Sequence, residues 1–220
     1  MQQQPKPVPP AEYQEQAIAS MDAAALVRIL QDKSAPEFQK AKACVRLGEL
    51  GAKEAIAPMA ALLGDEHLNV YARYGLEPIA DPAAAEALRA AVAKLKGNVQ
   101  IGVVNSLGKK RDELAVPMLG KLVYGQNVPL AQAAAAALGS IGGLASAKEL
   151  QAALGKTTGM MKMVVADAAL VCCERLIADG KREPALALYA VLSAPTTPKP
   201  QRLAAMSGII AEERSLARPR

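Results

Sequence analysis

One apolar pattern recurs along the chain at nearly constant spacing, and it constrains the fold more than any other feature. It can be followed from a set of leucines that stand 29 to 31 residues apart, at Leu47, Leu76, Leu107 and Leu138. Twelve residues after these leucines come Met59, Leu88, Leu119 and Leu150, and sixteen residues after them come Leu63, Val92, Val123 and Leu154. Offsets that differ by three or four residues place side chains on one face of an α-helix. Because the positions at all of these offsets recur together, the pattern predicts repeated helical units.

Each unit is predicted to hold two helices joined by a short turn. Four residues before the leucines, the first helices carry small or β-branched residues suited to a close helix contact: Ala43, Ala72, Val103 and Ala134. Gly51 and Gly142 stand four residues after their leucines, where the end of a helix favours a positive φ. Asp81 followed by Pro82 indicates an N-cap and the first position of a helix. Ser146 with Glu149 matches a capping box.

The composition favours helices throughout. Hydrophobic residues make up 51% of the chain but aromatic residues only 3%, with no Trp and one Phe. The apolar content is therefore mostly Ala, Leu, Val, Ile and Met, of which Ala, Leu and Met are strong helix formers. The alanine-rich stretch at 131–143, "AQAAAAALGSIGG", is interpreted as the first helix and turn of the fourth unit. The predicted fold is all-α, a right-handed α-solenoid of about five helical hairpins.

The fifth hairpin follows if an insertion is allowed. Leu176, Leu188 and Leu192 repeat the same offsets, and the segment 155–161 is expected to hold the additional residues. The predicted organisation is a disordered Pro/Gln-rich leader at 1–12, one or more N-terminal capping helices at 13–33, four units at 34–64, 65–96, 97–125 and 126–155, a fifth hairpin at 160–192 and a C-terminal helix at 198–214.

The units resemble HEAT repeats, particularly the short bacterial type known from phycobiliprotein lyases. The resemblance covers residues 34–154 and rests on the turns "LGELG" at 47–51 and "LGSIG" at 138–142, with Pro58 and Pro117 early in the second helices. It implies stacked helical hairpins and no particular catalytic residue.

Two further resemblances concern single segments. The stretch 72–112 is similar to a subfamily of repeat proteins from planctomycete-type bacteria, although its turns "LEPIAD" and "LGKKRD" depart from the usual repeat. Residues 166–192 are similar to a tetratricopeptide helix pair. Both kinds of repeat form hairpins that stack in a solenoid, so the predicted architecture is the same.

The residues that most often carry chemistry are few. His67 is the only histidine and is interpreted as a surface residue at a helix terminus rather than a general base. Cys44, Cys172 and Cys173 show no CxxC spacing and lie in apolar helical segments, so they are interpreted as packing residues, with a redox role for the adjacent pair left open. No metal ligand set is present. The chain is accordingly predicted not to be an enzyme and to bind no cofactor.

The charge is mildly basic, with a formal net charge of +5. The basic residues are spread along the chain, and the densest cluster, "KKR" at 109–111, is followed at once by Asp112 and Glu113. This pattern favours a solvated turn over a phosphate-binding clamp. A nucleic-acid partner is not expected.

A protein partner is expected. Tyr71, Arg73 and Tyr74 are the only local concentration of the residue types enriched at binding hot spots. Arg89 and Lys121, on the outward faces of second helices, complete the candidate set. The sequence predicts a scaffold or protein-interaction module, with a nucleic-acid-binding HEAT-like protein and a bilin lyase or chaperone-like protein as alternatives. A small-molecule substrate is not expected.

The chain contains no apolar run of about 18 residues, so no membrane-spanning helix is predicted. Its first residues lack the charged and apolar segments of a signal peptide. We expect a soluble protein, either cytoplasmic or exported with a signal peptide that this sequence does not include.

Overall fold

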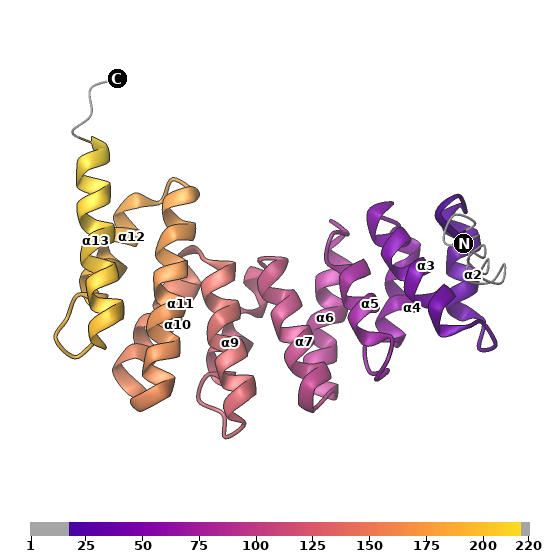
Figure 1. Ribbon diagram of the computed structural model, residues 1–220, viewed down its shortest axis with the longest axis horizontal. Helices are drawn as coiled ribbons and strands as arrows, with labels where there is room; N and C mark the ends of the chain where they lie inside the picture. Colours follow the sequence, from indigo (N-terminus) through magenta and orange to yellow (C-terminus); the bar gives the residue numbers. More distant parts are fainter. Residues whose placement is uncertain (1–17, 217–220) are drawn as a thin grey trace, which may run out of the picture. The chain divides into compact units, whose positions relative to one another are not determined.

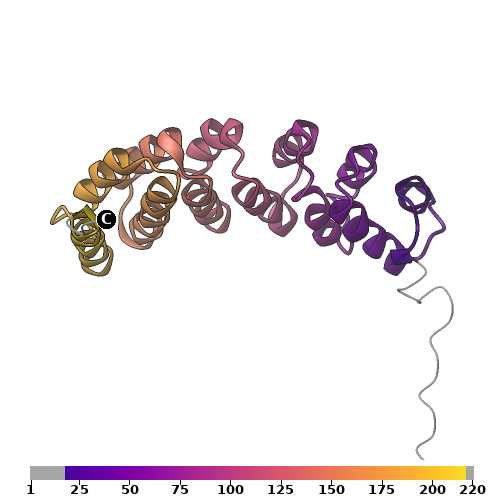
Figure 2. The same ribbon diagram turned by 90° about the horizontal axis from the view of Figure 1, so that it is seen from above.

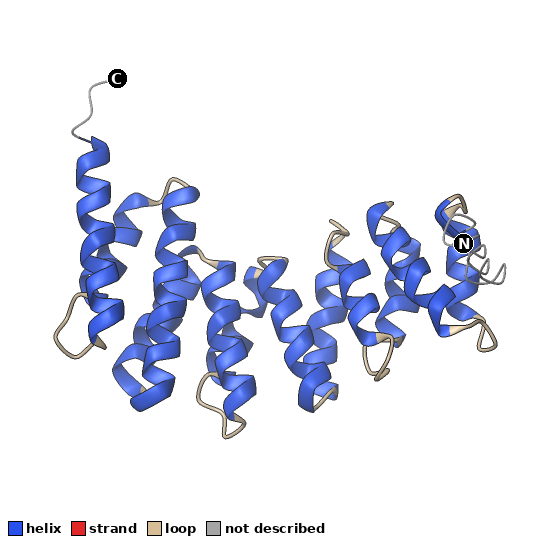
Figure 3. Cartoon of the chain, viewed as in Figure 1, coloured by secondary structure: helices blue, strands red, loops and turns tan. Residues whose placement is uncertain are grey.

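The structure is a computed structural model of the 220-residue chain, and it describes residues 18–216. Within that range all regular structure is helical, as Figure 3 shows. The helices are α2 (Ala23–Gln31), α3 (Glu37–Glu49), η2 (Lys53–Ala55), α4 (Ile56–Ala61), α5 (Asn69–Leu76), α6 (Pro82–Lys94), α7 (Gly97–Lys109), η3 (Glu113–Ala115), α8 (Val116–Leu122), α9 (Val128–Ile141), α10 (Gly143–Lys156), α11 (Gly159–Ala178), α12 (Arg182–Leu192) and α13 (Lys199–Leu216). The predicted leader at 1–12 lies outside the described residues.

The chain divides into two compact units, Met1–Leu95 and Lys96–Arg220. In the first, α2 packs on α3, α3 on α5, and α4 on both α5 and α6. In the second, α7, α9 and α11 lie side by side, while α8 contacts α10 and α10 contacts α12 (Figure 1). Within each unit, the helices lie in two layers, as Figure 2 shows. Each unit thus stacks helical hairpins in the manner of an α-solenoid, which confirms the predicted fold class.

The core follows the apolar pattern of the sequence. The leucines of all five predicted hairpins are fully buried, as are the residues four positions before the first four of them. The residues twelve and sixteen positions after the leucines are also buried. Because these residues lie on the inner faces of helices, or directly after the ends of α4 and α8, the hairpins within each unit bury an apolar layer between them.

The turns between helices agree with the sequence at three of the four places predicted. Gly51 and Gly142 have φ values of 64° and 69°. The Asp81 carboxylate accepts a hydrogen bond of 2.9 Å from the backbone N–H of Ala83, at the start of α6. The capping box is wrong: α10 follows directly on Gly142, so Ser146 lies buried inside the helix.

Candidate functional site

A surface pocket of about 540 Å³ lies between α3 and the start of α5, in the first unit. Its lining includes the only Phe and the only His of the chain, Phe38 and His67, together with Tyr71. The pocket thus brings three ring side chains together in a chain with few aromatic residues. The remaining lining residues are Glu37, Ala41, Lys42, Val45 and Leu68.

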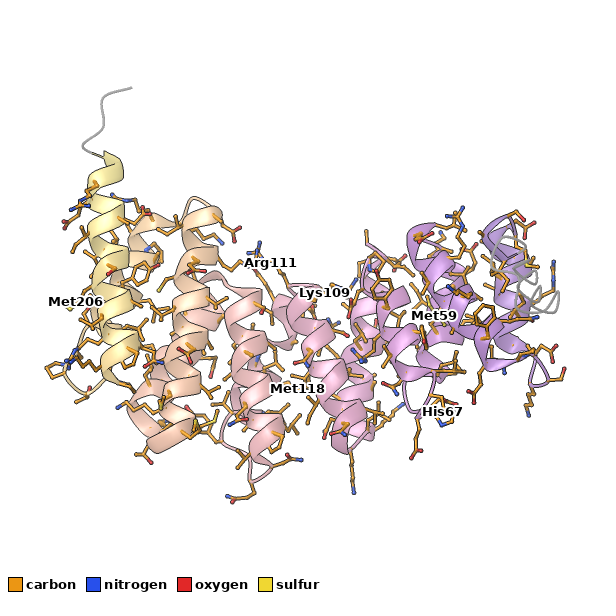
Figure 4. The ribbon with its side chains drawn as sticks, viewed as in Figure 1. Met59, His67, Lys109, Arg111, Met118 and Met206 are labelled. Atoms are coloured by element: carbon orange, nitrogen blue, oxygen red, sulfur yellow. The ribbon has the colours of Figure 1, made fainter. Side chains whose placement is uncertain are left out.

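Local hydrogen bonds hold the segment that carries His67. The carboxylate of Asp65 accepts bonds from the backbone N–H groups of His67, at 2.9 Å, and Leu68, at 2.8 Å. These bonds, the one from Leu68 first, hold the pKa of Asp65 below its usual range. The Asn69 amide donates a bond of 2.8 Å back to the Asp65 carbonyl oxygen. Figure 4 shows His67 in this loop, directly before α5.

The rim of the pocket carries both signs of charge. Nδ1 of His67 lies 3.0 and 3.1 Å from the two carboxylate oxygens of Glu37. This hydrogen bond, and then the charge of Glu37, raises the pKa of His67 above the usual value for histidine. On the same side of α3, Nζ of Lys42 lies 5.7 Å from the centre of the Phe38 ring, within the range of a cation–π contact.

The floor of the pocket is apolar. Ala41 and Leu68 are buried, and Val45 and Phe38 are half-buried. The Tyr71 side chain stands at its edge and is 43% exposed. An apolar floor with a few charged groups at the rim is the usual construction of a site that receives a side chain or a small apolar group.

The five residues that the sequence suggests for binding a partner lie at different places in the structure. Tyr71 lines the pocket, and Tyr74 is exposed one turn later on α5. Arg73 is half-buried on the same helix and Arg89 is half-buried on α6, while Lys121 is exposed on α8 in the second unit. Of the five, only Tyr71 belongs to the pocket.

The contribution of α3 to the pocket was not predicted from the sequence, although the spacing of the repeats contains the signal. Phe38 and His67 each stand nine residues before their repeat leucines, Leu47 and Leu76. Lys42 and Tyr71 stand five residues before the same leucines. Residues at equal offsets on neighbouring first helices lie side by side in a stacked array, so the register brings these pairs together.

The cysteines offer no accessible nucleophile. Cys44, Cys172 and Cys173 are buried and unpaired. Burial raises the pKa of the Cys44 thiol to about 12 and that of Cys172 to about 11, and it also raises the pKa of Cys173. Cys172 Sγ lies 3.9 Å from the Gly143 carbonyl oxygen, at the contact between α11 and α10. Within residues 18–216, no group of three or more His, Cys, Asp or Glu side chains is arranged to hold a metal ion.

Comparison with known proteins does not place the chain in a family. No family model matches the chain, and no curated protein matches it. Among solved structures, the chain is similar to human deoxyhypusine hydroxylase in complex with glycerol, with a TM-score of 0.46, 15% sequence identity, and coverage of 88% of this chain and 91% of that one. The chain has a helical-repeat, all-α fold. None of the helices described is both long and apolar enough to cross a membrane.

The prediction that the chain is not an enzyme, which rested on the small number of residues that carry chemistry, is wrong. The solved structure that it resembles is that of an enzyme. The physical reason lies in how repeat proteins build sites: Glu37 and His67 meet across 30 residues of sequence, so the absence of a local catalytic motif does not exclude catalysis. At this identity and TM-score, the likeness assigns no activity, substrate or cofactor to this chain.

Proposed function

We propose that this chain is a protein-binding helical-repeat module and that the pocket between α3 and α5 receives an apolar or aromatic side chain of the partner. The observation that carries the proposal is the pocket itself, with a buried floor of Ala41 and Leu68 and two aromatic walls, Phe38 and Tyr71. Partner side chains that fill such pockets contribute much of the affinity of protein interfaces.

The surface beside the pocket supports the same function. Val70 and Tyr74, on α5 next to Tyr71, are 52% and 55% exposed. Large apolar side chains exposed close together on one short helix favour a contact with another protein. The charges at the rim, Glu37, Lys42 and His67, are of mixed sign, which suits a polypeptide better than the uniformly negative backbone of a nucleic acid.

We infer that residues 34–154 form four HEAT repeats of the short bacterial type, that 160–192 form a tetratricopeptide-like hairpin, and that 198–214 form a closing helix. The repeated offsets of the buried residues support this assignment. Pro58 in α4 and Pro117 in α8 stand early in second helices, as HEAT repeats favour.

Selection of peptides from a random displayed library on the purified chain tests the proposal. We expect enriched peptides with a shared aromatic or large apolar residue, and we expect Tyr71→Ala to weaken their binding about tenfold, since loss of a hot-spot contact costs more than about 1 kcal/mol. Affinities are measured by fluorescence anisotropy.

The matched control is Tyr124→Ala, because Tyr124 is also 43% exposed but does not line this pocket. It should leave peptide affinity unchanged. Failure to enrich any peptide sequence, or equal affinities for the wild type and Tyr71→Ala, would overturn the proposal.

A further inference from the structure

The helix α13, in the second unit, packs with one face on α11 and α12. Gln201 and Ala205 are buried on that face, and the Gln201 amide donates a hydrogen bond of 2.8 Å to the Asp167 carboxylate of α11. Nε of Arg182, at the start of α12, donates a bond of 3.1 Å to the Glu212 carboxylate. These contacts fix which side of α13 faces away from the rest of the unit.

That outer side of α13 carries three large apolar residues, Leu203, Met206 and Ile210, which form the α13 stripe. Each of the three is 47% to 50% exposed. Their spacing of three and four residues places them together on the side of the helix opposite the buried Gln201 and Ala205. Figure 4 shows Met206 at the outer side of α13. Large apolar side chains gathered on one exposed face are typical of a surface that another molecule covers.

The two ends of the α13 stripe carry opposite charges. Lys199 stands seven residues before Met206 and Glu213 seven residues after it, and both are exposed. Seven residues are close to two helical turns, so both charged side chains lie along the stripe. Two further cations lie beside it: the half-buried Arg202, on the same edge as Glu213, and the exposed Arg214, on the other edge.

We propose that the α13 stripe is the contact between two copies of this chain, whose α13 helices pack antiparallel about a two-fold axis at Met206. In a two-fold contact, the same surface serves both copies. Met206 then meets Met206 of the second copy. Leu203 stands three residues before the axis and Ile210 four residues after it, so Leu203 of each copy packs beside Ile210 of the other.

The positions of the charges favour the antiparallel orientation. In an antiparallel pair, each residue lies opposite the one that is equally far on the other side of Met206. Lys199 of each copy therefore faces Glu213 of the other, while Arg214 lies farther away on the opposite edge of the stripe. A parallel pair would place Lys199 beside Lys199 and Glu213 beside Glu213. Complementary charges across an interface fix its orientation, because juxtaposed like charges are unfavourable.

The size of the contact indicates how strong the association is. The 18 residues of α13 form a helix about 27 Å long. A contact along one helix of this length is small for a protein interface, so we expect a reversible dimer and not an obligate one. None of the residues of the stripe lines the pocket between α3 and α5.

Sedimentation velocity of the full chain at increasing protein concentration tests for this dimer. We expect a reversible shift from monomer to dimer. Met206→Glu places two carboxylates at the two-fold axis and should raise the dissociation constant at least about tenfold. The matched control is Leu144→Glu, at an exposed residue of α10, which should leave the dissociation constant unchanged. Circular dichroism of dilute, monomeric samples should show the wild-type melting temperature for both variants, because both positions are exposed.

Exchange of the charges at Lys199 and Glu213 tests the orientation. Lys199→Glu and Glu213→Lys each replace two opposite-charge pairs with two like-charge pairs, so each should weaken the dimer about threefold at low ionic strength. The double variant Lys199→Glu with Glu213→Lys restores opposite charges and should return the dissociation constant to the wild-type value. A double variant as weak as the single variants would overturn the antiparallel contact.

Two other outcomes would overturn the dimer itself. They are a chain that stays monomeric at every concentration and a dimer that Met206→Glu leaves unchanged. A monomeric chain that binds phosphatidylglycerol vesicles, and loses this binding in Met206→Glu, would assign the α13 stripe to a lipid surface and would also overturn the proposal.

Discussion

Gly48 of α3 and Gly75 of α5 face each other across the contact between these two helices. A Cβ atom on Gly48 would lie 2.7 Å from the carbonyl oxygen of Gly75, and one on Gly75 would lie 2.5 Å from the carbonyl oxygen of Cys44. No side-chain carbon approaches a backbone oxygen so closely. The two helices therefore touch through their backbones, and the spacing of the hairpins in the first unit depends on both glycines.

Gly75→Ala is expected to destabilise the chain. Alanine is favoured over glycine inside a helix by about 1 kcal/mol, but overpacking of a closed contact costs about 1 to 3 kcal/mol. The neighbouring atoms at Gly75 include the Cys44 backbone, which can yield only if α3 moves. We expect a net loss of stability, seen as a lower melting temperature by circular dichroism.

Gly155→Ala is the matched control for this substitution. Gly155 also lies inside a helix, α10, but a Cβ atom there would meet nothing within 4 Å. Only the preference of a helix for alanine over glycine then acts, and we expect the free energy of unfolding to rise by about 0.5 to 1 kcal/mol. A Gly75→Ala variant as stable as the Gly155→Ala variant would show that α3 and α5 are not in backbone contact.

Ala134→Leu tests the alanine-rich helix α9 in the second unit. Ala134 is fully buried, so three added heavy atoms have no space, and we expect a loss of about 1 to 3 kcal/mol. For a chain of this length, the melting temperature should fall by several degrees, about 2 to 4 °C for each kcal/mol. The exposed Ala152→Leu in α10 serves as the control and should change stability by less than about 0.5 kcal/mol. An unchanged melting temperature for Ala134→Leu would contradict the packing of α9.

The buried face of each hairpin was predictable from sequence because it depends on spacing within single helices. Ile56 and Met59 of α4 and Leu63, directly after that helix, stand three and four residues apart, and all three are buried. The positive φ of Gly142 was predictable for the same reason, since only its distance from the end of α9 matters. The prediction of a capping box at Ser146 was wrong because α10 begins directly after Gly142, without the loop residues that a capping box needs.

The pocket between α3 and α5 and the ion pair between Arg111 and Asp179 depend instead on contacts between residues far apart in the sequence. Glu37 and His67 are 30 residues apart, and Arg111 and Asp179 are 68 residues apart. Alignment of the repeats places Arg111 at a glycine position, but it does not reveal that the side chain reaches across a whole hairpin. That contact depends on how α7, α9 and α11 stack. The pattern of apolar residues does not predict this stacking in enough detail to place the side chain.

The pair of Glu37 and His67 predicts a titration that can be followed directly. His67 is the only histidine, so its ring resonances need no assignment. Its pKa is raised in the folded state, chiefly by the hydrogen bond that its Nδ1 donates to the Glu37 carboxylate. A group with a raised pKa stabilises the fold at pH values below its unfolded pKa, and this contribution is lost as the pH rises through the folded pKa. We expect nuclear magnetic resonance to report a pKa above the usual value for histidine.

Substitution of the carboxylates near His67 tests the cause of this shift. Glu37→Gln should bring the pKa of His67 down toward its ordinary value, because it removes both the charge and the strongest hydrogen-bond acceptor. Glu66→Gln should have a smaller effect, since Glu66 acts on His67 only through its charge and is the weakest of the causes. Equal effects of the two substitutions would show that His67 and Glu37 are not in contact.

The three buried cysteines predict low thiol reactivity in the folded chain. The thiolate is the reactive form, and burial raises the pKa of Cys44 to about 12 and of Cys172 to about 11. We expect a disulfide reagent at about pH 8 to modify the native protein slowly, and to modify all three cysteines rapidly once guanidinium chloride unfolds it, where thiols regain a pKa of about 8.5. Mass spectrometry counts the modified thiols. A single thiol that reacts as fast in the native as in the unfolded protein would contradict the burial of that cysteine, and Cys→Ser variants, prepared one at a time, would identify it.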